Sequence, residues 1–137
     1  MSAVRETHIR VRYQETDNMG VVYYANYFVW FEIARSEYFR SLGISYREME
    51  KRGVFMMVAR AACDYKSPAR YDDVVHVQAW IPEVRNTSLR FAYKLFVGDR
   101  LIATGESGHV FTDRQKRPVR VPQEVRNIAT REEERVG

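Results

Sequence analysis

The sequence contains one cysteine, four prolines and no long hydrophobic run among its 137 residues. Because Cys63 has no partner within the chain, an internal disulfide cannot form, and a reducing, cytoplasmic compartment is expected. No stretch approaches the roughly twenty apolar residues that a membrane span requires, so no span is predicted. Residues 1–6 have no apolar run behind Arg5, which argues against a secretory signal.

Lysine is also scarce, because four of the 22 basic residues are lysines and the other eighteen are arginines. The net charge of +4 is modest and spread along the chain, which indicates one soluble, folded domain rather than a disordered polyelectrolyte. Arginine forks bind phosphate through paired hydrogen bonds, so the bias favours a phosphate-bearing ligand. A solvated surface shaped by codon or thermal bias explains it equally well, and composition leaves both interpretations open.

The common signatures of covalent, metal and nucleotide chemistry are missing. The segment Gly105–His109 has the outline of a nucleophile elbow, but it ends in histidine instead of glycine and lies in a predicted strand. His8, His76 and His109 lie far apart in the sequence and lack the spacing of zinc ligands, so no metal site is predicted. No glycine-rich phosphate loop is present, so no cofactor is expected.

The N-terminal half combines one strand with two helices. Apolar and polar residues alternate over residues 6–13, which predicts a half-buried strand. Over residues 27–42 apolar residues recur every three or four positions, which predicts an amphipathic helix with Asn26 as N-cap and Gly43 as its stop. Capping-box spacing predicts a shorter second helix over residues 45–53.

The rest of the chain has the alternation of strands. Four are predicted, of which the second stops before Pro82 and the last two are joined by a Gly98-Asp99 hairpin: 54–63, 74–81, 89–97 and 101–111. Residues 122–137 end in a mixed-charge run and are expected to form a frayed tail. The order of elements predicts an α+β fold, a single domain over residues 1–137 with one main helix against an antiparallel sheet.

The predicted sheet has a second apolar face that one helix cannot cover. Residues of the opposite parity include four large apolar side chains, Trp80, Phe96, Ile102 and Val110. Because a large apolar patch is rarely left in water, a homodimer is predicted, formed through edge strands or packed faces.

The loop before the main helix is the best candidate for chemistry. Asp17 lies there just ahead of Gly20, a residue that favours a tight backbone turn or a close backbone approach. An aspartate in a loop usually caps a helix or stabilises a turn. Here the helix begins about nine residues after Asp17, which is beyond the reach of an ordinary N-cap. The helix end near Tyr24 and Asn26 presents free N–H groups that would polarise a carbonyl. A carboxylate opposite them could attack that carbonyl or activate water, which is the outline of an acyl-transfer site.

The run from Tyr13 to Tyr27, YQETDNMGVVYYANY, resembles the signature of the 4-hydroxybenzoyl-CoA thioesterase family, the hotdog-fold acyl-CoA thioesterases. The likeness continues through residues 65–73, 85–88 and 115–118, so it covers nearly the whole chain. It implies a curved antiparallel sheet wrapped around one long central helix and a site at a dimer interface. The implied activity is hydrolysis of an acyl-CoA thioester to a free carboxylic acid and CoA.

The resemblance also implies roles for individual residues. Asp17 matches the catalytic carboxylate, a nucleophile or a general base for water, and the N–H groups around Tyr24 match the donors that polarise the thioester carbonyl. Many bacterial relatives, including those associated with the Tol-Pal system, have His in place of Tyr24, so the general-acid role of that His is not carried over.

The resemblance also implies a set of residues that bind the substrate. Val58, Ala59 and Arg60 fall on the strand that lines the acyl pocket from the partner subunit. The other substrate-binding residues are Gly20, Val21 and Asn26 near the loop and, where the CoA arm tends to run, Lys66, Ser67, Pro68, Ser88 and Arg90.

Two other functions remain open, a non-catalytic acyl or nucleic-acid binding module and a hotdog dehydratase. A nucleic-acid partner is disfavoured because the basic residues are scattered, and such a binder should weaken steeply with salt. A dehydratase normally pairs a His with a carboxylate, and no His neighbours Asp17 in the loop. The sequence also leaves open the acyl chain length, aromatic or aliphatic acids, CoA or a carrier protein, and a dimer or a tetrameric dimer of dimers.

Overall fold

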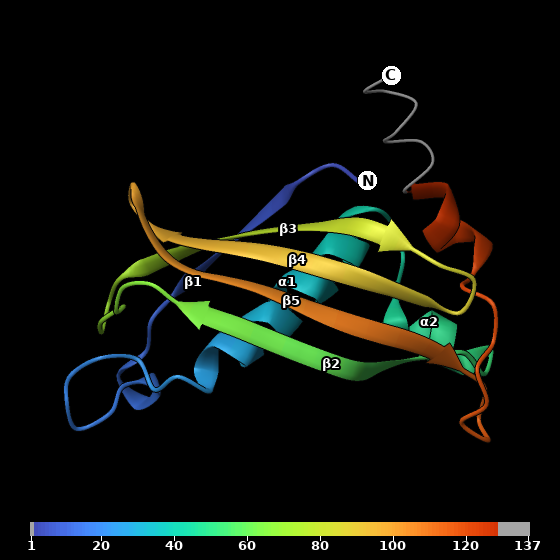
Figure 1. The fold of residues 1–137 in the computed structure, drawn as a ribbon, viewed down its shortest axis with the longest axis horizontal. Helices are drawn as coiled ribbons and strands as arrows, with labels where there is room; N and C mark the ends of the chain where they lie inside the picture. Colours follow the sequence, from blue (N-terminus) through green and yellow to red (C-terminus); the bar gives the residue numbers. More distant parts are fainter. Residues whose placement is uncertain (1, 129–137) are drawn as a thin grey trace.

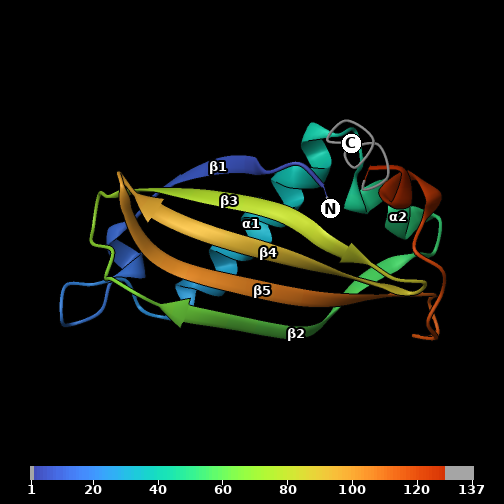
Figure 2. The ribbon, with the colours of Figure 1, turned by 45° about the horizontal axis from the view of Figure 1, so that its top comes forward.

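The computed structural model describes residues 2–128, in which one curved sheet wraps around one long helix (Figures 1 and 2). The helices are α1 (Asn26–Ser41), α2 (Tyr46–Lys51) and a 3-10 turn (Tyr13–Glu15). The strands run in the antiparallel order β1-β3-β4-β5-β2, with bounds β1 (Arg5–Arg10), β2 (Phe55–Tyr65), β3 (Val74–Val84), β4 (Ser88–Val97) and β5 (Arg100–Thr112). The predicted α+β hotdog architecture is confirmed. None of the described helices is long and apolar enough to span a bilayer.

The core is built from aromatic side chains between α1 and the sheet. Trp30, Phe31, Tyr38 and Phe39 on α1 are at most 1% exposed. The ring of Phe31 stacks on Tyr93 of β4, with centroids 4.2 Å apart. Strands β3 and β4 bury alternate residues over most of their length, because one face meets the helix and the other faces outward.

Several predicted boundaries are wrong for local physical reasons. The first strand, predicted over residues 6–13, ends at Arg10, because the 3-10 turn begins at Tyr13. Asn26 is the first residue of α1 rather than its N-cap, since its side chain donates to the Glu15 carbonyl at 2.9 Å and the capping position is Ala25. Strand β3 continues through Pro82 to Val84, because a register shift between Trp80 and Glu83 places the proline in an irregular stretch of the ladder.

The predicted frayed tail, residues 122–137, is wrong for its first part. Residues 123–128 are helical, and Val125 and Ile128 are 0% and 3% exposed. Together with Val121 they recur at the i, i+4, i+7 spacing of an amphipathic helix, which anchors the segment to the core. Residues 129–137, the remainder of that tail, lie outside the described residues.

The second face of the sheet is less apolar than predicted. Trp80, Phe96 and Val110 are half-buried on it, whereas Ile102 is fully buried in the core. The ladder between β4 and β5 pairs Phe96 with Leu101 and Leu95 with Ala103, so Ile102 is the extra residue of a bulge. The bulge reverses the alternation at that position.

Gly105 on β5 offers a test of the packing between sheet and helix. A Cβ atom at this position would lie 2.3 Å from Cζ of Phe31, whereas one at Gly108 would meet nothing closer than Arg60 Cβ at 3.7 Å. We expect Gly105→Ala to lower the free energy of unfolding by about 1–3 kcal/mol through overpacking, and Gly108→Ala on the same strand to have little effect. Urea denaturation of the two variants measures the difference, and equal stabilities would contradict this description of the core.

Candidate active site

The loop that carries Asp17 is a short, tightly bonded hairpin. Thr16 and Val22 form an antiparallel bridge, and the Asp17 N–H donates to the Val21 carbonyl at 2.8 Å. Gly20 has a φ of 79°, and its N–H donates to the Asp17 carbonyl at 3.0 Å. Glycine adopts this conformation without a steric penalty, so it closes the turn that holds Asp17.

The carboxylate of Asp17 is exposed yet directed by the turn. Its Oδ1 accepts the N–H of Met19 at 2.8 Å, which is the ordinary role of an aspartate in such a turn. This bond orients the carboxylate without burying it. A ligand that approaches from solvent can therefore reach the side chain.

A buried carboxylate, Glu15, joins this loop to α1. The residue is 4% exposed, and its side chain accepts hydrogen bonds from Trp30 Nε1 at 2.9 Å and from the Arg12 N–H at 2.8 Å. Its backbone carbonyl accepts the Tyr23 N–H at 2.8 Å and the Asn26 side chain at 2.9 Å. One residue thus fixes the loop that holds Asp17 and the chain entering the helix.

Burial alone would raise the pKa of Glu15, but hydrogen bonds outweigh it. The donors are the Arg12 N–H, the Trp30 indole and the Arg12 guanidinium, and together they lower the pKa of Glu15 below its ordinary value. The group is therefore a carboxylate at neutral pH. We call this set of hydrogen bonds to the carboxylate and the carbonyl of Glu15 the Glu15 clamp. The sequence did not predict it, because nothing in the polar loop distinguishes Glu15 as a buried residue.

The start of α1 presents backbone donors that the helix does not use. The N–H groups of Asn26, Tyr27 and Phe28 donate to carbonyls three residues earlier, while among residues 2–128 no backbone carbonyl accepts those of Tyr24 and Ala25. They lie at the positive end of a helix of 16 residues. Such donors stabilise an oxyanion if a carbonyl oxygen is bound there.

Tyr65, at the end of β2, holds the same segment from the other side. Its hydroxyl donates to the carbonyl of Tyr24 at 2.9 Å, and its ring meets Tyr27 edge-on at 4.9 Å. Burial raises the pKa of this phenol, so it remains a donor at neutral pH. Tyr65 is a positioning residue that sequence reasoning did not single out, although it begins one of the segments of the family resemblance.

Part of the predicted CoA-binding segment lies next to the loop. The Val22 N–H donates to the Ala69 carbonyl at 2.8 Å, and Val21 pairs with Arg70. The three residues that precede Ala69 are thereby drawn to the same end of the molecule, on the left of Figure 1, and they are Lys66, Ser67 and Pro68. Arg100 donates to Ser67 Oγ at 2.5 Å and to the Pro68 carbonyl at 2.7 Å, so it adds a cation there.

The other predicted residues form a separate group in the middle of the sheet. Val58 lies seven residues before Tyr65, which is roughly 23 Å along an extended strand. Val58 lines one hollow, and another hollow is lined by Ala59, Ser88 and Arg90. Arg60 and Arg90 each approach the carboxylate of Glu106. Within one chain the structure does not bring them to Asp17, so their roles stay predictions.

The outward hollow of this group has a largely apolar lining with two arginines, Arg85 and Arg90, at its wall. Its volume is about 260 Å³, and Ala59, Ser88 and Arg90 contribute to its lining. Arg60 is ion-paired with Glu106, which also lies 3.6 Å from Arg90. The guanidinium groups are thus partly neutralised by the carboxylates between them, and they remain close to the surface.

A second cavity lies between α1, α2 and the inner side of β2. Its volume is about 280 Å³, and Val58, Met56 and Met49 supply apolar walls. Arg35 and His109 supply polar ones. The side chain of Arg35 donates to the Tyr93 hydroxyl at 3.1 Å, and Ser107 Oγ bonds both that hydroxyl, at 2.6 Å, and His109 Nε2, at 2.7 Å.

His109 is a neutral member of this network. Burial, aided by the charge of Arg35, lowers the pKa of His109 to about 3. Its Nδ1 is buried and has no hydrogen-bond partner among residues 2–128. The cavity is therefore walled in part by a neutral imidazole. The sequence did not reveal it, because its residues come from four distant segments.

The two remaining histidines are not isolated, although the sequence spacing predicted no partner for them. Antiparallel pairing of β1 with β3 places His8 opposite His76, and Glu6 lies within hydrogen-bond reach of both. Cys63 is a half-buried thiol, and burial raises its pKa to about 11, so it stays protonated at neutral pH. This environment is that of an unreactive thiol packed within a strand.

The Glu15 clamp predicts a pH dependence. Because the folded-state pKa is depressed, the stabilisation is complete above the unfolded-state value near 4.5 and is lost as the pH falls through the lower folded value. In Glu15→Gln one donor faces an amide NH₂ instead of an oxygen, so unfolding at pH 7 should become easier by about 1–3 kcal/mol. The difference in the free energy of unfolding between wild type and Glu15→Gln, measured by urea titration, should shrink below pH 4.5.

The matched control for this change is Glu48→Gln, which removes an exposed carboxylate that is ion-paired with Lys51 at 3.6 Å. Its effect should stay below about 1 kcal/mol at any pH. A gap between wild type and Glu15→Gln that did not depend on pH would contradict the role of the charge.

Comparisons with known proteins agree with this architecture. Residues 11–128 match the family described as the thioesterase-like superfamily. The YneP protein of Bacillus subtilis is 35% identical over 113 residues, which are 82% of this chain and 82% of YneP. The acyl-CoA thioesterase YbgC of Haemophilus influenzae is 32% identical over 120 residues, which are 86% of this chain and 88% of YbgC.

A solved structure extends the agreement to three dimensions. The DHNA-CoA thioesterase from Staphylococcus aureus superposes with a TM-score of 0.88 at 31% identity, covering 93% of this chain and 89% of that one. The predicted hotdog fold and thioesterase resemblance are thus confirmed. Because the family match spans most of the sequence, the chain belongs to the thioesterase-like superfamily.

Proposed function

We propose that the protein hydrolyses an acyl-CoA thioester to a free acid and CoA, with Asp17 as the catalytic carboxylate. The observation that carries this proposal is the pairing of an exposed, oriented carboxylate with two unused N–H groups at the start of α1. The Glu15 clamp binds the two parts to each other. Relatives named as acyl-CoA thioesterases support the substrate class.

The thioester carbonyl would accept the Tyr24 N–H, where the positive end of α1 stabilises the charge that develops on oxygen. In one route Asp17 attacks the carbonyl carbon, CoA leaves as its thiolate, and water cleaves the resulting anhydride. In the other route Asp17 takes a proton from water, and the hydroxide adds to the same carbon. Both routes yield the acid and CoA and regenerate the Asp17 carboxylate. Neither requires a metal or a cofactor.

The phosphates of CoA would extend along a basic path. Lys66 and Arg100 lie beside Ser67 next to the loop, and Arg90 lines the outward hollow with Ser88. Guanidinium and ammonium groups at such positions suit phosphate oxygens. This proposal assigns a phosphate partner to some of the arginines that composition left unexplained.

A homodimer would complete the site. Strand β2 is an edge of the sheet as described, and its Met57 and Val58 are 42% and 57% exposed. Val29 and Ile33 on α1 are also exposed, so the edge is apolar on two elements. Pairing this edge with a second copy would bury these side chains and bring Val58, Ala59 and Arg60 of one protomer toward Asp17 of the other.

The acyl group would then occupy the cavity behind Val58. A volume of about 280 Å³ suits a small acyl group, and Met49 and Met56 supply the apolar contact. Arg35 and His109 line the same cavity, so a polar substituent on the acyl group would meet polar side chains there.

Replacing Asp17 by Asn should reduce thioester turnover by about 100-fold or more, because the amide is neither a nucleophile nor a base. The amide oxygen still accepts the Met19 N–H, so the turn should persist. Free CoA release is measured with short, medium and long aliphatic acyl-CoAs and with benzoyl- and 4-hydroxybenzoyl-CoA. An enzyme-only blank corrects for Cys63 with thiol reagents.

The control is Asp99→Asn, in the exposed hairpin turn between β4 and β5, which should keep wild-type turnover. Unchanged turnover in Asp17→Asn would refute the assignment. Inactivity of the wild type across the whole panel would refute CoA as the carrier.

Subunit mixing tests the shared site. Val58→Trp places a bulky ring in the acyl cavity at an exposed position, so it should inactivate without unfolding. Co-refolding this variant with Asp17→Asn in equal amounts should restore about a quarter of the wild-type activity, because half of the dimers are mixed and each has one intact site. No recovery, with dimers verified by light scattering, would mean that each site lies within one chain.

A further inference from the structure

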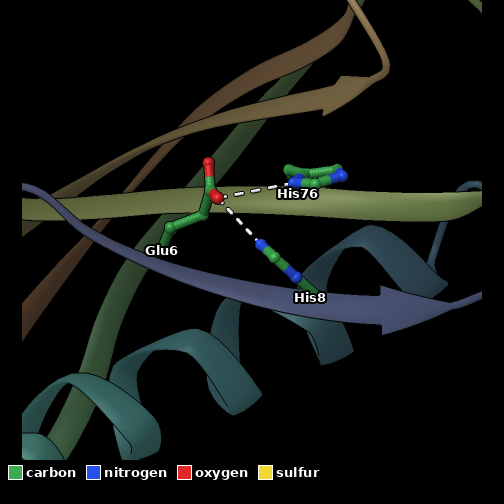
Figure 3. A group of neighbouring side chains, drawn as sticks. All are labelled: Glu6, His8 and His76. Atoms are coloured by element: carbon green, nitrogen blue, oxygen red, sulfur yellow. Dashed lines mark hydrogen bonds and ion pairs between the residues drawn. The ribbon is translucent and has the colours of Figure 1, made fainter.

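Three potential ligands meet on the outward face of the sheet near its β1 edge (Figure 3). His8 Nε2 lies 2.8 Å from Glu6 Oε2, and His76 Nδ1 lies 3.4 Å from the same oxygen. The imidazole rings of His8 and His76 have centroids 4.1 Å apart. All three ligand atoms lie within 4.8 Å of one another.

We propose that Glu6, His8 and His76 bind a late first-row divalent cation, with Zn²⁺ as the physiological candidate. Two imidazole nitrogens and one carboxylate oxygen are a donor set that suits Zn²⁺, Cu²⁺ and Ni²⁺. With bonds of about 2.0–2.1 Å, three such ligand atoms stand roughly 3.3–4 Å apart around the ion. The present spacing reaches that geometry through small side-chain rotations.

The backbone brings these groups together. Residues 6 and 8 alternate with an intervening residue that faces the core, so both point outward. The register pairs His8 directly with His76 across the β1–β3 ladder, and Glu6 pairs with Gln78. The ligands therefore sit on a hydrogen-bonded sheet rather than on a loop. This arrangement limits the entropy that a cation must overcome when it binds.

The surroundings suit a cation. Arg10, the next outward residue of β1, directs its guanidinium to Asp72, with an N–O distance of 3.2 Å. His76 faces Phe96 on the other side, and Gln78 faces Glu6, so both neighbours are uncharged. The side chain of His8 is 56% exposed, that of Glu6 40% and that of His76 35%, so an ion and its remaining water ligands have room.

A bound ion would join the edge strand β1 to β3. Three protein ligands leave at least one coordination position to water, so the site is open and exchangeable rather than closed. Because the ion binds the folded register and not the unfolded chain, it should raise the melting temperature. This role is separate from thioester hydrolysis, and it would hold even if the proposed function failed.

The test measures Zn²⁺ binding to the untagged full-length chain by competition with a chromophoric chelator. The wild type should bind one ion per chain, and His8→Ala and His76→Ala should each weaken binding by roughly tenfold or more. The control Gln78→Ala keeps all three ligands and should bind like the wild type. His109 and Cys63 are present in every variant, so they cannot produce the difference.

Two further readouts distinguish the site from nonspecific binding. Electron paramagnetic resonance of the Cu²⁺-loaded chain should show two coupled imidazole nitrogens, and the double variant His8→Ala/His76→Ala should lose both. Zn²⁺ should raise the melting temperature of the wild type but not of the double variant. Equal Zn²⁺ affinities in wild type and double variant would overturn the proposal.

Discussion

The hydrogen bonds of the buried Glu15 are the constraint on which the rest of the site depends. Its carboxylate accepts from Trp30 in the core and from the Arg12 N–H, while its carbonyl accepts from Tyr23 and Asn26. The ionised carboxylate is stable in this position because the Trp30 and Arg12 donors converge on it. Through this residue, the aromatic core determines where the loop with Asp17 and the start of α1 lie relative to each other. The chemistry at the surface is thus positioned from within.

The sheet adds a second constraint, because its edges decide what one chain can complete. The contact of Gly105 with Phe31 and the stacking of Phe31 on Tyr93 hold α1 in the curve of the sheet. With β2 left as an edge strand, its Val58 lies roughly 23 Å along the strand from the end that approaches Tyr24, so one chain separates the carboxylate from the inner cavity. This separation is the physical reason for proposing a site shared by two protomers. The hydrogen-bond network of Arg35 and His109 forms part of the wall of that cavity.

The fold could be predicted from the sequence because its signals are local. Period-two strands, the helix ended by Gly43 and the Gly98-Asp99 hairpin follow from neighbouring residues, and the Asp17 loop carries a specific signature. The features that were wrong or unforeseen depend on tertiary contacts. Pro82 lies in a bulge that only the β3–β4 register creates. Val125 and Ile128 are held in place by the core that they cover. His8 lies next to His76 only because β1 pairs with β3. The same holds for the cavity of His109.

The central claim is that Asp17 and the free N–H groups at the start of α1 act on the same carbonyl. Infrared difference spectroscopy tests it directly, with an acyl-CoA labelled with carbon-13 at the thioester carbonyl and bound to the slow variant Asp17→Asn. The account predicts that the carbonyl stretch moves to lower frequency than that of the free thioester in water, because the Tyr24 N–H and the helix dipole polarise the bond. A bound substrate whose carbonyl stretch stays at the value in water would contradict it.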